Sequence, residues 1–524
     1  MPDASTLECL QLDELQVVSD LHLGGSEGFQ IFGSARELAW LARQVAASKV
    51  PGQAALLING DFIDFLAEDV PRAFDPDGVA AKLDRVLGDK HFKPVFDALA
   101  DLLAQPRRLL IINLGNHDLE LALPWVRERL AATLCRGSAA ARAQLHLVTD
   151  GTGVRARVGH ASVLCLHGNE IDAWNVTDHE RLRRIARDRQ YGLPTEFWVP
   201  NAGAQLVVEV LNPIKASYPF VDLLKPETQA VIPVLSALNP ALMPRLREIA
   251  TIASRGAADA LRMRTGLLSA GDSADTRDSE MPDAASPLPG GAGSASPQAS
   301  AQILMQQAER AFADRTTPIS LVRSSQADQL GFWTAAWDRL RGQPTHEVLR
   351  EALECLDQDR SFDTGAADDT FRQFDARIGP EIDLLLTGHT HLARSLARTR
   401  GNGHYFNSGT WARLMRLAPE VRRDKQRFKQ WFELLGRGRM ADLDAAPGVV
   451  MRLNTVIKIW ADGGATHAEL QQVQAAADGS VAALAQAGTR RSLGAPAGTV
   501  AAAAPIKAPV KAPTKPAAKP SKPA

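Results

Sequence analysis

The chain has 524 residues, of which 45% are hydrophobic and 23% charged, and its formal net charge at pH 7 is −1. This composition is typical of a globular protein, and the length allows a sizeable core and more than one domain. The near-neutral charge excludes a global electrostatic field that would recruit nucleic acid or an anionic membrane.

The amino terminus and the cysteines favour a cytoplasmic protein. Met1–Ser5 does not form a basic region leading into an apolar core, so no secretory signal is expected. No run of about 20 apolar residues exists, so we expect no membrane span, although peripheral contact with a membrane stays open. The cysteines are far apart, without metal-ligand or disulfide spacing, which suits a reducing compartment. They are Cys9, Cys135, Cys165 and Cys355.

Residues 12–200 alternate apolar, strand-like runs with helical patterns such as Glu37–Ala47 and Phe92–Ala104. This alternation predicts βαβ construction. Four strand-like runs in this region, and a fifth near residue 382, each end directly before a polar motif. The five runs are Leu15–Val18, Ala54–Asn59, Arg108–Asn113, Ser162–Leu166 and Ile382–Leu386.

Residues 204–375 have a different pattern, and we expect a mainly helical insertion there. Residues 204–268 carry apolar side chains at helical spacing, and helical patterning resumes over 302–314 and 328–357. Residues 269–300 contain little that can be buried, which predicts disorder. The insertion either caps the site or forms a helical layer with no contact to substrate. Several short helices, broken at prolines, are expected before residue 268. These prolines are Pro213, Pro219, Pro226, Pro233, Pro240 and Pro244.

The carboxyl-terminal region completes the predicted core and then loses its pattern. Residues 454–460 resemble a late core strand, so the core is assigned to 12–203 and 376–475. Residues 488–524 are rich in Ala, Pro and Lys and are predicted to be a disordered tail. Residues 490–524 contain seven Lys or Arg and no acidic residue, so the rest of the chain has a net charge of −8. The tail is either solvated or weakly attached to acidic surfaces.

The five motifs carry the side chains of a metal site. Open α/β sheets place their ligands at the carboxyl ends of strands, so polar clusters at five strand ends can converge. Carboxylate and imidazole donors suit Mn, Fe, Co or Zn better than an all-oxygen Mg or Ca site. Two cations about 3.5–4 Å apart need a bridging carboxylate, for which Asp61 is the candidate. The motifs are Ser19-Asp20-Leu21-His22, Gly60-Asp61-Phe62-Ile63-Asp64, Gly115-Asn116-His117-Asp118, Leu166-His167-Gly168-Asn169 and Gly388-His389-Thr390-His391.

The order and content of these motifs resemble the calcineurin-like metallophosphoesterase superfamily. The resemblance implies an α/β fold of four layers, αββα, with two facing mixed sheets flanked by helices. It implies hydrolysis of a phosphoester through a hydroxide that bridges two divalent ions, for which Mn is preferred and Fe, Zn and Co are alternatives. The implied ligands are Asp20, His22 and His391 for the first ion, Asn116, His167 and His389 for the second, and Asp61 as the bridge.

The same resemblance implies catalytic roles for two residues that are not ligands. His117 matches the histidine that contacts the scissile phosphate and assists the departing oxygen. Asp64 matches the carboxylate that orients this histidine, favouring its cationic form. For Asp118 a cap on a helix that begins at Leu119 is the alternative to a role in the site.

The substrate class is less constrained by the motifs. The sequences of the motifs most resemble those of the branch that contains UDP-2,3-diacylglucosamine hydrolases. The shared segments are Ser-Asp-Leu-His-Leu and His-Gly-Asn-Glu-Ile-Asp. Those enzymes typically carry arginine at the position of His117 and aspartate at that of Asn169, and their insertion is much shorter. We therefore expect a phosphodiester or a pyrophosphate substrate without naming it.

Two further functions stay open. An exonuclease-type hydrolase, acting on DNA or nucleotides, is suggested by Gly-Asn-His-Asp but needs a basic surface for the phosphate backbone. The second alternative is a scaffold protein that keeps the fold but has no catalytic activity.

The cluster of arginines near the predicted site would either hold a second phosphate or form a salt-bridged helix face, and we favour the latter. It comprises Arg181, Arg183, Arg184, Arg187 and Arg189.

Overall fold

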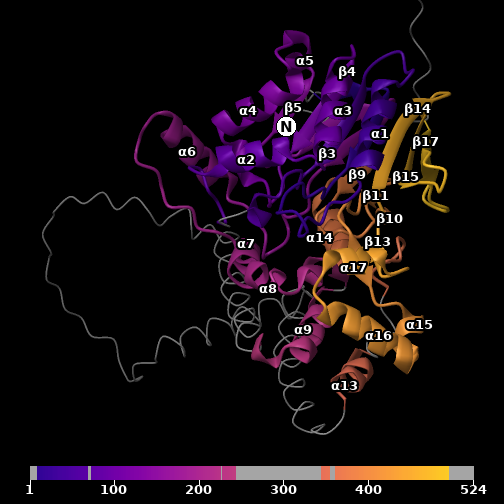
Figure 1. Ribbon diagram of the computed structural model, residues 1–524. Coiled ribbons are helices and arrows are strands. Elements are labelled where there is room, and N and C mark those ends of the chain that lie inside the picture. The colour runs from indigo at the N-terminus through magenta and orange to yellow at the C-terminus, as the bar shows by residue number, and fades with distance from the viewer. Residues whose placement is uncertain (1–8, 69–71, 226, 243–343, 354–359, 495–524) are drawn as a thin grey trace, which may run out of the picture.

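The computed structural model of the protein describes residues 9–68, 72–225, 227–242, 344–353 and 360–494 (Figure 1). The stretch predicted to be disordered, 269–300, and the predicted helix 302–314 lie outside these residues. So do residues 495–524 of the predicted tail. None of the helices in the described ranges is both long enough and apolar enough to cross a lipid bilayer.

The first of two mixed sheets has eight strands, in the order β16-β15-β14-β2-β3-β4-β5, with β17 also paired to β15. Strands β2 to β5 run parallel to one another, whereas β14 joins β2 antiparallel. The strands are β2 (Glu14–Val18), β3 (Ala54–Asn59), β4 (Arg108–Asn113), β5 (Leu145–Val148), β14 (Thr455–Asp462), β15 (Ala465–Ala475), β16 (Val481–Ala485) and β17 (Arg491–Gly494).

The second sheet has six strands in the order β1-β6-β7-β9-β11-β10. Its central strands β7, β9 and β11 are parallel, so their carboxyl ends meet at one edge. The strands are β1 (Leu10–Leu12), β6 (Val154–Val158), β7 (Ala161–Cys165), β9 (Leu384–Thr387), β10 (Arg394–Ala397) and β11 (His404–Asn407).

The two sheets pack face to face, and alternate residues of each strand point to opposite layers. In β3, Ala55 and Leu57 pack in the core between the sheets, whereas Leu56 and Ile58 pack against the outer helices. Because both faces are covered, the strand is a continuous apolar run rather than an alternating one. This double burial explains why the parallel strands were recognisable in the sequence.

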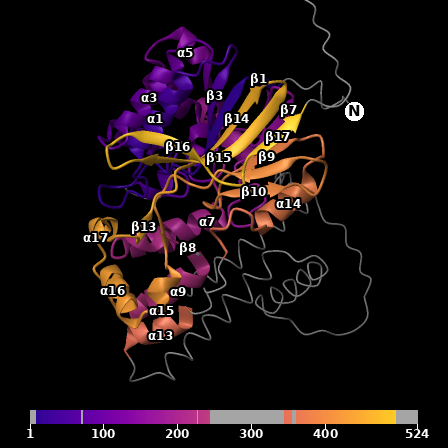
Figure 2. The same ribbon diagram turned by 90° about the vertical axis from the view of Figure 1, so that its right-hand side faces the viewer.

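Helices cover the outer face of each sheet, which completes the predicted αββα order (Figures 1 and 2). Four helices pack on the eight-stranded sheet through one apolar cluster. On the six-stranded sheet, Phe371 and Phe374 of α14 pack against Leu385 and Tyr405. The helices are α1 (Ala35–Ala46), α2 (Val79–Gly88), α3 (Lys93–Leu103), α4 (Pro124–Cys135) and α14 (Asp369–Arg377), with α5 (Ala139–Ala143), α6 (His179–Gln190) and the short η2 (Phe65–Ala67) and η3 (Leu119–Ala122) in connections.

A second body, the helical subdomain, lies at one end of the sandwich, below it in Figures 1 and 2. We define it as the described residues of 202–242, 344–353 and 414–451, which share one apolar core. A three-stranded sheet in the order β13-β12-β8 ties these segments together. Its elements are α7 (Ala202–Gln205), η4 (Leu206–Leu211), α8 (Asn212–Lys215), η5 (Pro219–Asp222), β8 (Leu224–Lys225), α9 (Glu227–Leu238), η6 (Pro240–Leu242), α13 (Thr345–Ala352), β12 (Leu414–Arg416), α15 (Pro419–Arg423), α16 (Lys425–Gly436), α17 (Met440–Ala445) and β13 (Val450–Met451).

The structure corrects three of the predicted boundaries. The segment α14 was assigned to the insertion but packs on the core sheet. Residues 419–445 were assigned to the core but form helices of the helical subdomain, because their apolar faces pack with α9 and α13. The core also continues past residue 475 through β16 and β17, so residues 491–494 pair with β15 rather than starting a disordered tail.

The prolines of the insertion break helices less often than predicted. Pro233 lies inside α9. Pro213 stands in the first turn of α8, directly after the π-helical turn η4, so the chain stays helical from Ala202 to Lys215.

Candidate metal centre

The five motifs follow five strands whose carboxyl ends lie at the same edge of the sandwich. Three of these strands, β2, β3 and β4, are parallel neighbours in one sheet, and β7 and β9 are parallel neighbours in the other. The structure therefore brings together the side chains of eight residues that the sequence placed in the site, whereas the Asn116 side chain donates to Asn175 at 3.4 Å. The eight are Asp20, His22, Asp61, Asp64, His117, His167, His389 and His391.

The motif backbones are held in an unusual conformation. Eight non-glycine residues of the described chain have positive φ, and five of them are candidate ligands. A side chain in this left-handed region is strained and is usually retained where function requires it. Here it occurs two or four residues after the end of the preceding strand. The five are Asp20 (φ 53°), His22 (50°), Asp61 (51°), His389 (68°) and His391 (63°).

Two glycines allow the loops to approach one another closely. Gly60 has φ of 91°, and a side chain at this position would collide with the His167 ring. A side chain at Gly115 would collide with the Asp61 carboxylate. The glycine of each motif therefore leaves space for a ligand that comes from another motif.

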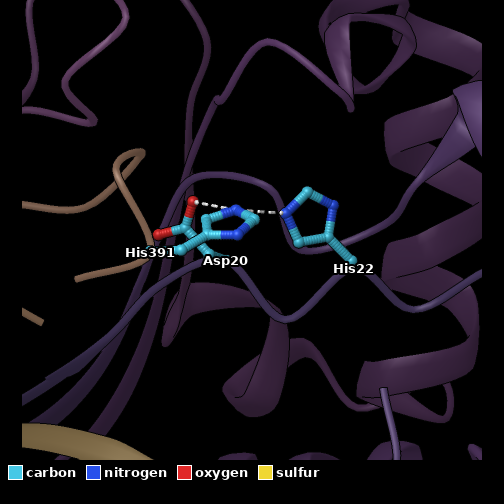
Figure 3. A group of neighbouring side chains, drawn as sticks. All are labelled: Asp20, His22 and His391. Atoms are coloured by element: carbon cyan, nitrogen blue, oxygen red, sulfur yellow. Dashed lines mark hydrogen bonds and ion pairs between the residues drawn. The ribbon is translucent and has the colours of Figure 1, made fainter. Parts of the chain in front are cut away.

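The first group of donor atoms comprises Asp20, His22 and His391 (Figure 3). Nε2 of His391 lies 3.0 Å from Nε2 of His22 and 3.4 Å from Oδ1 of Asp20. Burial and the nearby Lys225 ammonium lower the pKa of His391 to about 4, so its ring is neutral at pH 7. A neutral imidazole beside a carboxylate is a donor set that a divalent cation can use.

The second group comprises Asp61, His167 and His389. Nδ1 of His167 donates to the Asn59 carbonyl at 2.8 Å, which leaves Nε2 facing the group, 3.3 Å from Oδ2 of Asp61. Burial favours the neutral ring, but the Asp61 carboxylate outweighs it and raises the pKa of His167 to about 10. A positive charge is therefore stabilised here, and a divalent ion would supply it in place of the proton.

Asp61 lies between the two groups. Its Oδ2 is 3.8 Å from Nε2 of His22 and 3.3 Å from Nε2 of His167, while Oδ1 accepts the backbone N–H of His117 at 2.9 Å. Burial would raise its pKa, but the imidazoles of His167 and His117 hold the pKa of Asp61 well below its ordinary value. The carboxylate is therefore ionised and central, as a bridging ligand must be.

Three buried donor atoms at this edge lack a hydrogen-bond partner within the described residues. They are Oδ1 of Asn116, Nε2 of His167 and Nδ1 of His391. Buried polar atoms are rarely left unsatisfied, because desolvation without a partner costs about 1–3 kcal/mol each. All three belong to residues of the predicted ligand set, and a bound cation would satisfy Oδ1 of Asn116 and Nε2 of His167. The residues present therefore fit the divalent ions that the motifs imply.

A third group of potential ligand atoms comprises His22, Asp61 and His117, and His117 also pairs with Asp64. The His117 ring donates from Nδ1 to Oδ1 of Asp64 at 3.0 Å. Burial lowers the pKa of His117, but the carboxylates of Asp64 and Asp61 raise it to about 9, so the ring is an imidazolium at neutral pH. The other oxygen of Asp64 lies 3.1 Å from Nδ1 of His22, a contact that the sequence did not suggest.

Two acidic residues of the fourth motif loop were missed by the sequence reasoning. Oδ2 of Asp172 lies 2.8 Å from Nε2 of His389. Glu170 accepts the backbone N–H groups of His167 at 3.0 Å and Gly168 at 2.6 Å, which fixes the loop. The sequence does contain a signal for these two residues, the run Asn169-Glu170-Ile171-Asp172 shortly after the predicted ligand His167. This run was interpreted only as a resemblance to a known motif, so its two acidic side chains were not assigned to the site.

Asp118 does not cap the following helix with its side chain. Its two oxygens accept the backbone N–H groups of Gly115 at 2.7 Å and Phe62 at 2.8 Å. Asp118 therefore joins the second and third motif loops. Burial and the neighbouring Asp61 carboxylate raise the pKa of Asp118 to about 7.

The arginine cluster of α6 is a salt-bridged helix face, as favoured from the sequence. Each guanidinium lies within 4.0 Å of an acidic side chain. The cluster is thus largely neutralised and offers little free charge to a nucleic-acid backbone. The pairs are Arg181 with Glu196, Arg183 with Glu180, Arg184 with Glu196, Arg187 with Asp188 and Arg189 with Asp77.

Comparison with known proteins agrees with this geometry. A family model described as calcineurin-like phosphoesterase matches residues 16–222, which include the first four motifs. The match ends before Gly388-His389-Thr390-His391, and the structure brings this fifth motif to the other four. No curated protein matches the chain. The family and the donor groups together indicate a metal-binding hydrolase that acts on phosphoesters. Residues 16–222 of this chain belong to the calcineurin-like phosphoesterase family.

Proposed function

We propose that this protein hydrolyses a phosphodiester or a pyrophosphate with two divalent metal ions, of which Mn is preferred. The observation that carries this proposal is the position of Asp61. Its carboxylate belongs to two of the three donor groups and lies between the histidines of the other loops. A single central carboxylate with imidazoles on both sides is the arrangement that holds two cations a few ångströms apart.

When bound, the ions would lower the pKa of a water molecule and neutralise charge on the phosphoryl oxygens. The first ion would be held by Asp20, His22 and His391, and the second by Asn116, His167 and His389, with Asp61 shared. The chain positions these donors before any ion binds, because strained backbone, glycine contacts and hydrogen bonds fix each loop. Little reorganisation is then needed at the moment of reaction.

His117 supplies the proton in this proposal. Asp64 fixes Nδ1 of the ring, so Nε2 is the atom left to face the substrate. As an imidazolium, His117 donates from Nε2 to the departing oxygen, which stabilises the leaving group as its bond to phosphorus breaks. The Asp64 carboxylate keeps the ring in this charge state and orientation.

The test uses the full chain, freed of metal and reloaded with Mn. Metal content is measured by mass spectrometry, and turnover is measured on a bis-aryl phosphodiester, an aryl monoester, a nucleotide-sugar pyrophosphate and linear DNA. We expect two ions per chain and hydrolysis of the diester or the pyrophosphate. Preferred cleavage of linear DNA would favour the exonuclease-type alternative, and two ions without any turnover would favour a scaffold.

The bridging role of Asp61 is tested separately. Asp61→Asn keeps the size of the side chain but removes its charge, so metal content and turnover should fall together. Asp77→Asn is the matched control, since Asp77 is an exposed aspartate that pairs with Arg189 of α6 and belongs to none of the five motifs. Two ions per chain and normal turnover in Asp61→Asn would overturn the bridging assignment.

A further inference from the structure

The side chain of Asn175 connects two residues that are assigned to the second ion. Its Nδ2 donates to Oδ2 of Asp172 at 2.7 Å, and its Oδ1 accepts from Nδ2 of Asn116 at 3.4 Å. The same Oδ2 of Asp172 lies 2.8 Å from Nε2 of His389. One amide group therefore holds Asn116 directly and His389 through a single carboxylate. Asn175 belongs to none of the five motifs.

The direction of these hydrogen bonds decides which atom of Asn116 stays free. The Asp172 carboxylate can only accept, so Asn175 must turn its NH₂ group toward it. Oδ1 of Asn175 then faces Asn116 and requires the NH₂ group of that side chain. Oδ1 of Asn116 is left over, and it is a buried atom without a hydrogen-bond partner in the described part of the chain. The amide oxygen is the end of an asparagine that binds a cation.

The first helix of the helical subdomain, α7, packs against the loop that carries Asn175. The backbone N–H of Gly203, in α7, donates to the Trp174 carbonyl at 2.8 Å. Asn201, the residue before α7, donates from Nδ2 to the Val176 carbonyl at 3.4 Å. These two bonds hold the backbone on both sides of Asn175, so the position of its side chain depends on the position of α7.

Gly203 is glycine because Asn175 occupies the space of a side chain. A Cβ at Gly203 would collide with Oδ1 of Asn175 and would lie 2.8 Å from its Cγ. The backbone conformation does not itself require glycine, since Gly203 is helical and has no positive φ. The absent side chain therefore allows a close approach of α7 to the Asn175 amide.

We propose that Asn175 is a positioning residue for the second metal ion and that α7 holds it in place. Asn175 orients Asn116 directly and His389 through Asp172. Within the described residues, its side chain makes no hydrogen bond to a ligand of the first ion. This inference rests on the proposed function and deepens it. The helical subdomain sets the affinity for the second ion because α7 seats the amide that orients two of its ligands.

The test compares Asn175→Ala, which removes the amide, with Gly203→Ala, which keeps the amide but displaces it. Metal-free, full-length protein is titrated with Mn by calorimetry. In each variant the affinity for one ion should fall by about 10–100-fold, the usual effect of removing a partner of a metal ligand, and the other affinity should be unchanged. Thermal unfolding of the metal-free protein should show that Gly203→Ala is folded, since alanine favours a helix more than glycine does.

Gly88→Ala is the matched control. Gly88 also lies in a helix without positive φ, but a Cβ there would meet no atom within 4 Å. This variant should bind both ions as the wild type does.

The double variant Asn175→Ala with Gly203→Ala separates positioning from general damage to the structure. If the Gly203→Ala methyl group acts by displacing the Asn175 amide, it has no amide to displace once position 175 is alanine. The double variant should then bind both ions as Asn175→Ala does, whereas losses that add would mean that the two changes act independently. Additive losses, equal loss of both ions or no loss would each overturn the inference.

Turnover distinguishes this inference from the proposed function. If the wild type binds two ions and hydrolyses a phosphoester while the variants bind Mn as the wild type does, the positioning role is wrong and the proposed function stands. If the wild type binds two ions but hydrolyses nothing, the proposed function fails. The Mn titrations then still decide whether Asn175 positions the ligands of one ion.

Discussion

The Asp172 carboxylate lies 2.8 Å from Nε2 of His389, although 217 positions separate the two residues in the chain. Asp172 also accepts from the side chain of Asn175 at 2.7 Å and from the backbone N–H of Trp174 at 2.9 Å. The carboxylate is therefore held in place before it meets the imidazole. A carboxylate on one nitrogen of a histidine fixes the ring and makes its other nitrogen a better metal ligand.

We predict that Asp172→Ala weakens binding of one metal ion by about 10–100-fold, the usual effect of removing such a partner. The other ion should be retained, because its donors do not contact Asp172. Calorimetric titration of metal-free protein with Mn measures both affinities. Asp101→Ala is the control, since Asp101 is an exposed residue that pairs with Arg136. Equal loss of both ions would show that Asp172 supports the fold rather than His389.

His117→Ala should separate catalysis from metal binding. The variant is expected to load two ions and to fold normally, while kcat falls by about 10²–10⁴ because the proton donor is lost. The loss should be larger for an alkyl leaving group than for nitrophenolate, which needs little protonation. Paired measurements of metal content and kcat on both substrate types check this. A variant that loses its metals, or that keeps kcat on the alkyl ester, would contradict the proton-donor role.

The central features of the fold were predictable because they are local in the sequence. Strands buried on both faces appear as apolar runs, and β3 and β4 were predicted with the boundaries that the structure has. The polar motif after each strand then fixes which edge holds the site. This edge could be identified without knowledge of long-range packing, since parallel strands bring their carboxyl ends together.

The features that were missed depend on contacts between distant segments. Helices α15 to α17 lie in sequence between the core strands β11 and β14, so they were assigned to the core, yet their apolar residues pack in the helical subdomain. Strand β17 has no apolar alternation and forms because β15 offers an edge to pair with. The partner of His389 could not be identified from spacing, because loop packing alone brings Asp172 to it.

Asp64→Asn should affect both metal binding and catalysis. The family resemblance alone predicts an effect on catalysis only, through the orientation of His117. One oxygen of Asp64 serves His117 and the other serves His22. Asparagine can accept through only one oxygen, so one ring would face an NH₂ group. We expect metal affinity to fall together with kcat. Excess Mn should restore metal content but leave kcat below that of the wild type, and full recovery of kcat would contradict the contact to His117.

The buried carboxyl of Glu120 makes stability depend on pH independently of the metal centre. Glu120 is 1% exposed, and its Oε1 accepts the backbone N–H of Asp75 at 2.9 Å. Burial raises its pKa from 4.5 to about 7. Between these values the folded chain binds more protons than the unfolded chain, so the free energy of unfolding decreases as the pH rises through this window.

Glu120→Gln keeps the acceptor for Asp75 but cannot ionise, so it should stabilise the protein at high pH and not at low pH. At pH 8.5 the gain should be on the order of 2–3 kcal/mol, because each unit of pKa shift corresponds to about 1.4 kcal/mol. At pH 4.5 the variant and the wild type should unfold alike. Denaturant unfolding at both pH values measures the difference, and Glu433→Gln, at an exposed ion pair, is the control. A gain of equal size at both pH values would mean that Glu120 is not protonated in the folded protein at neutral pH.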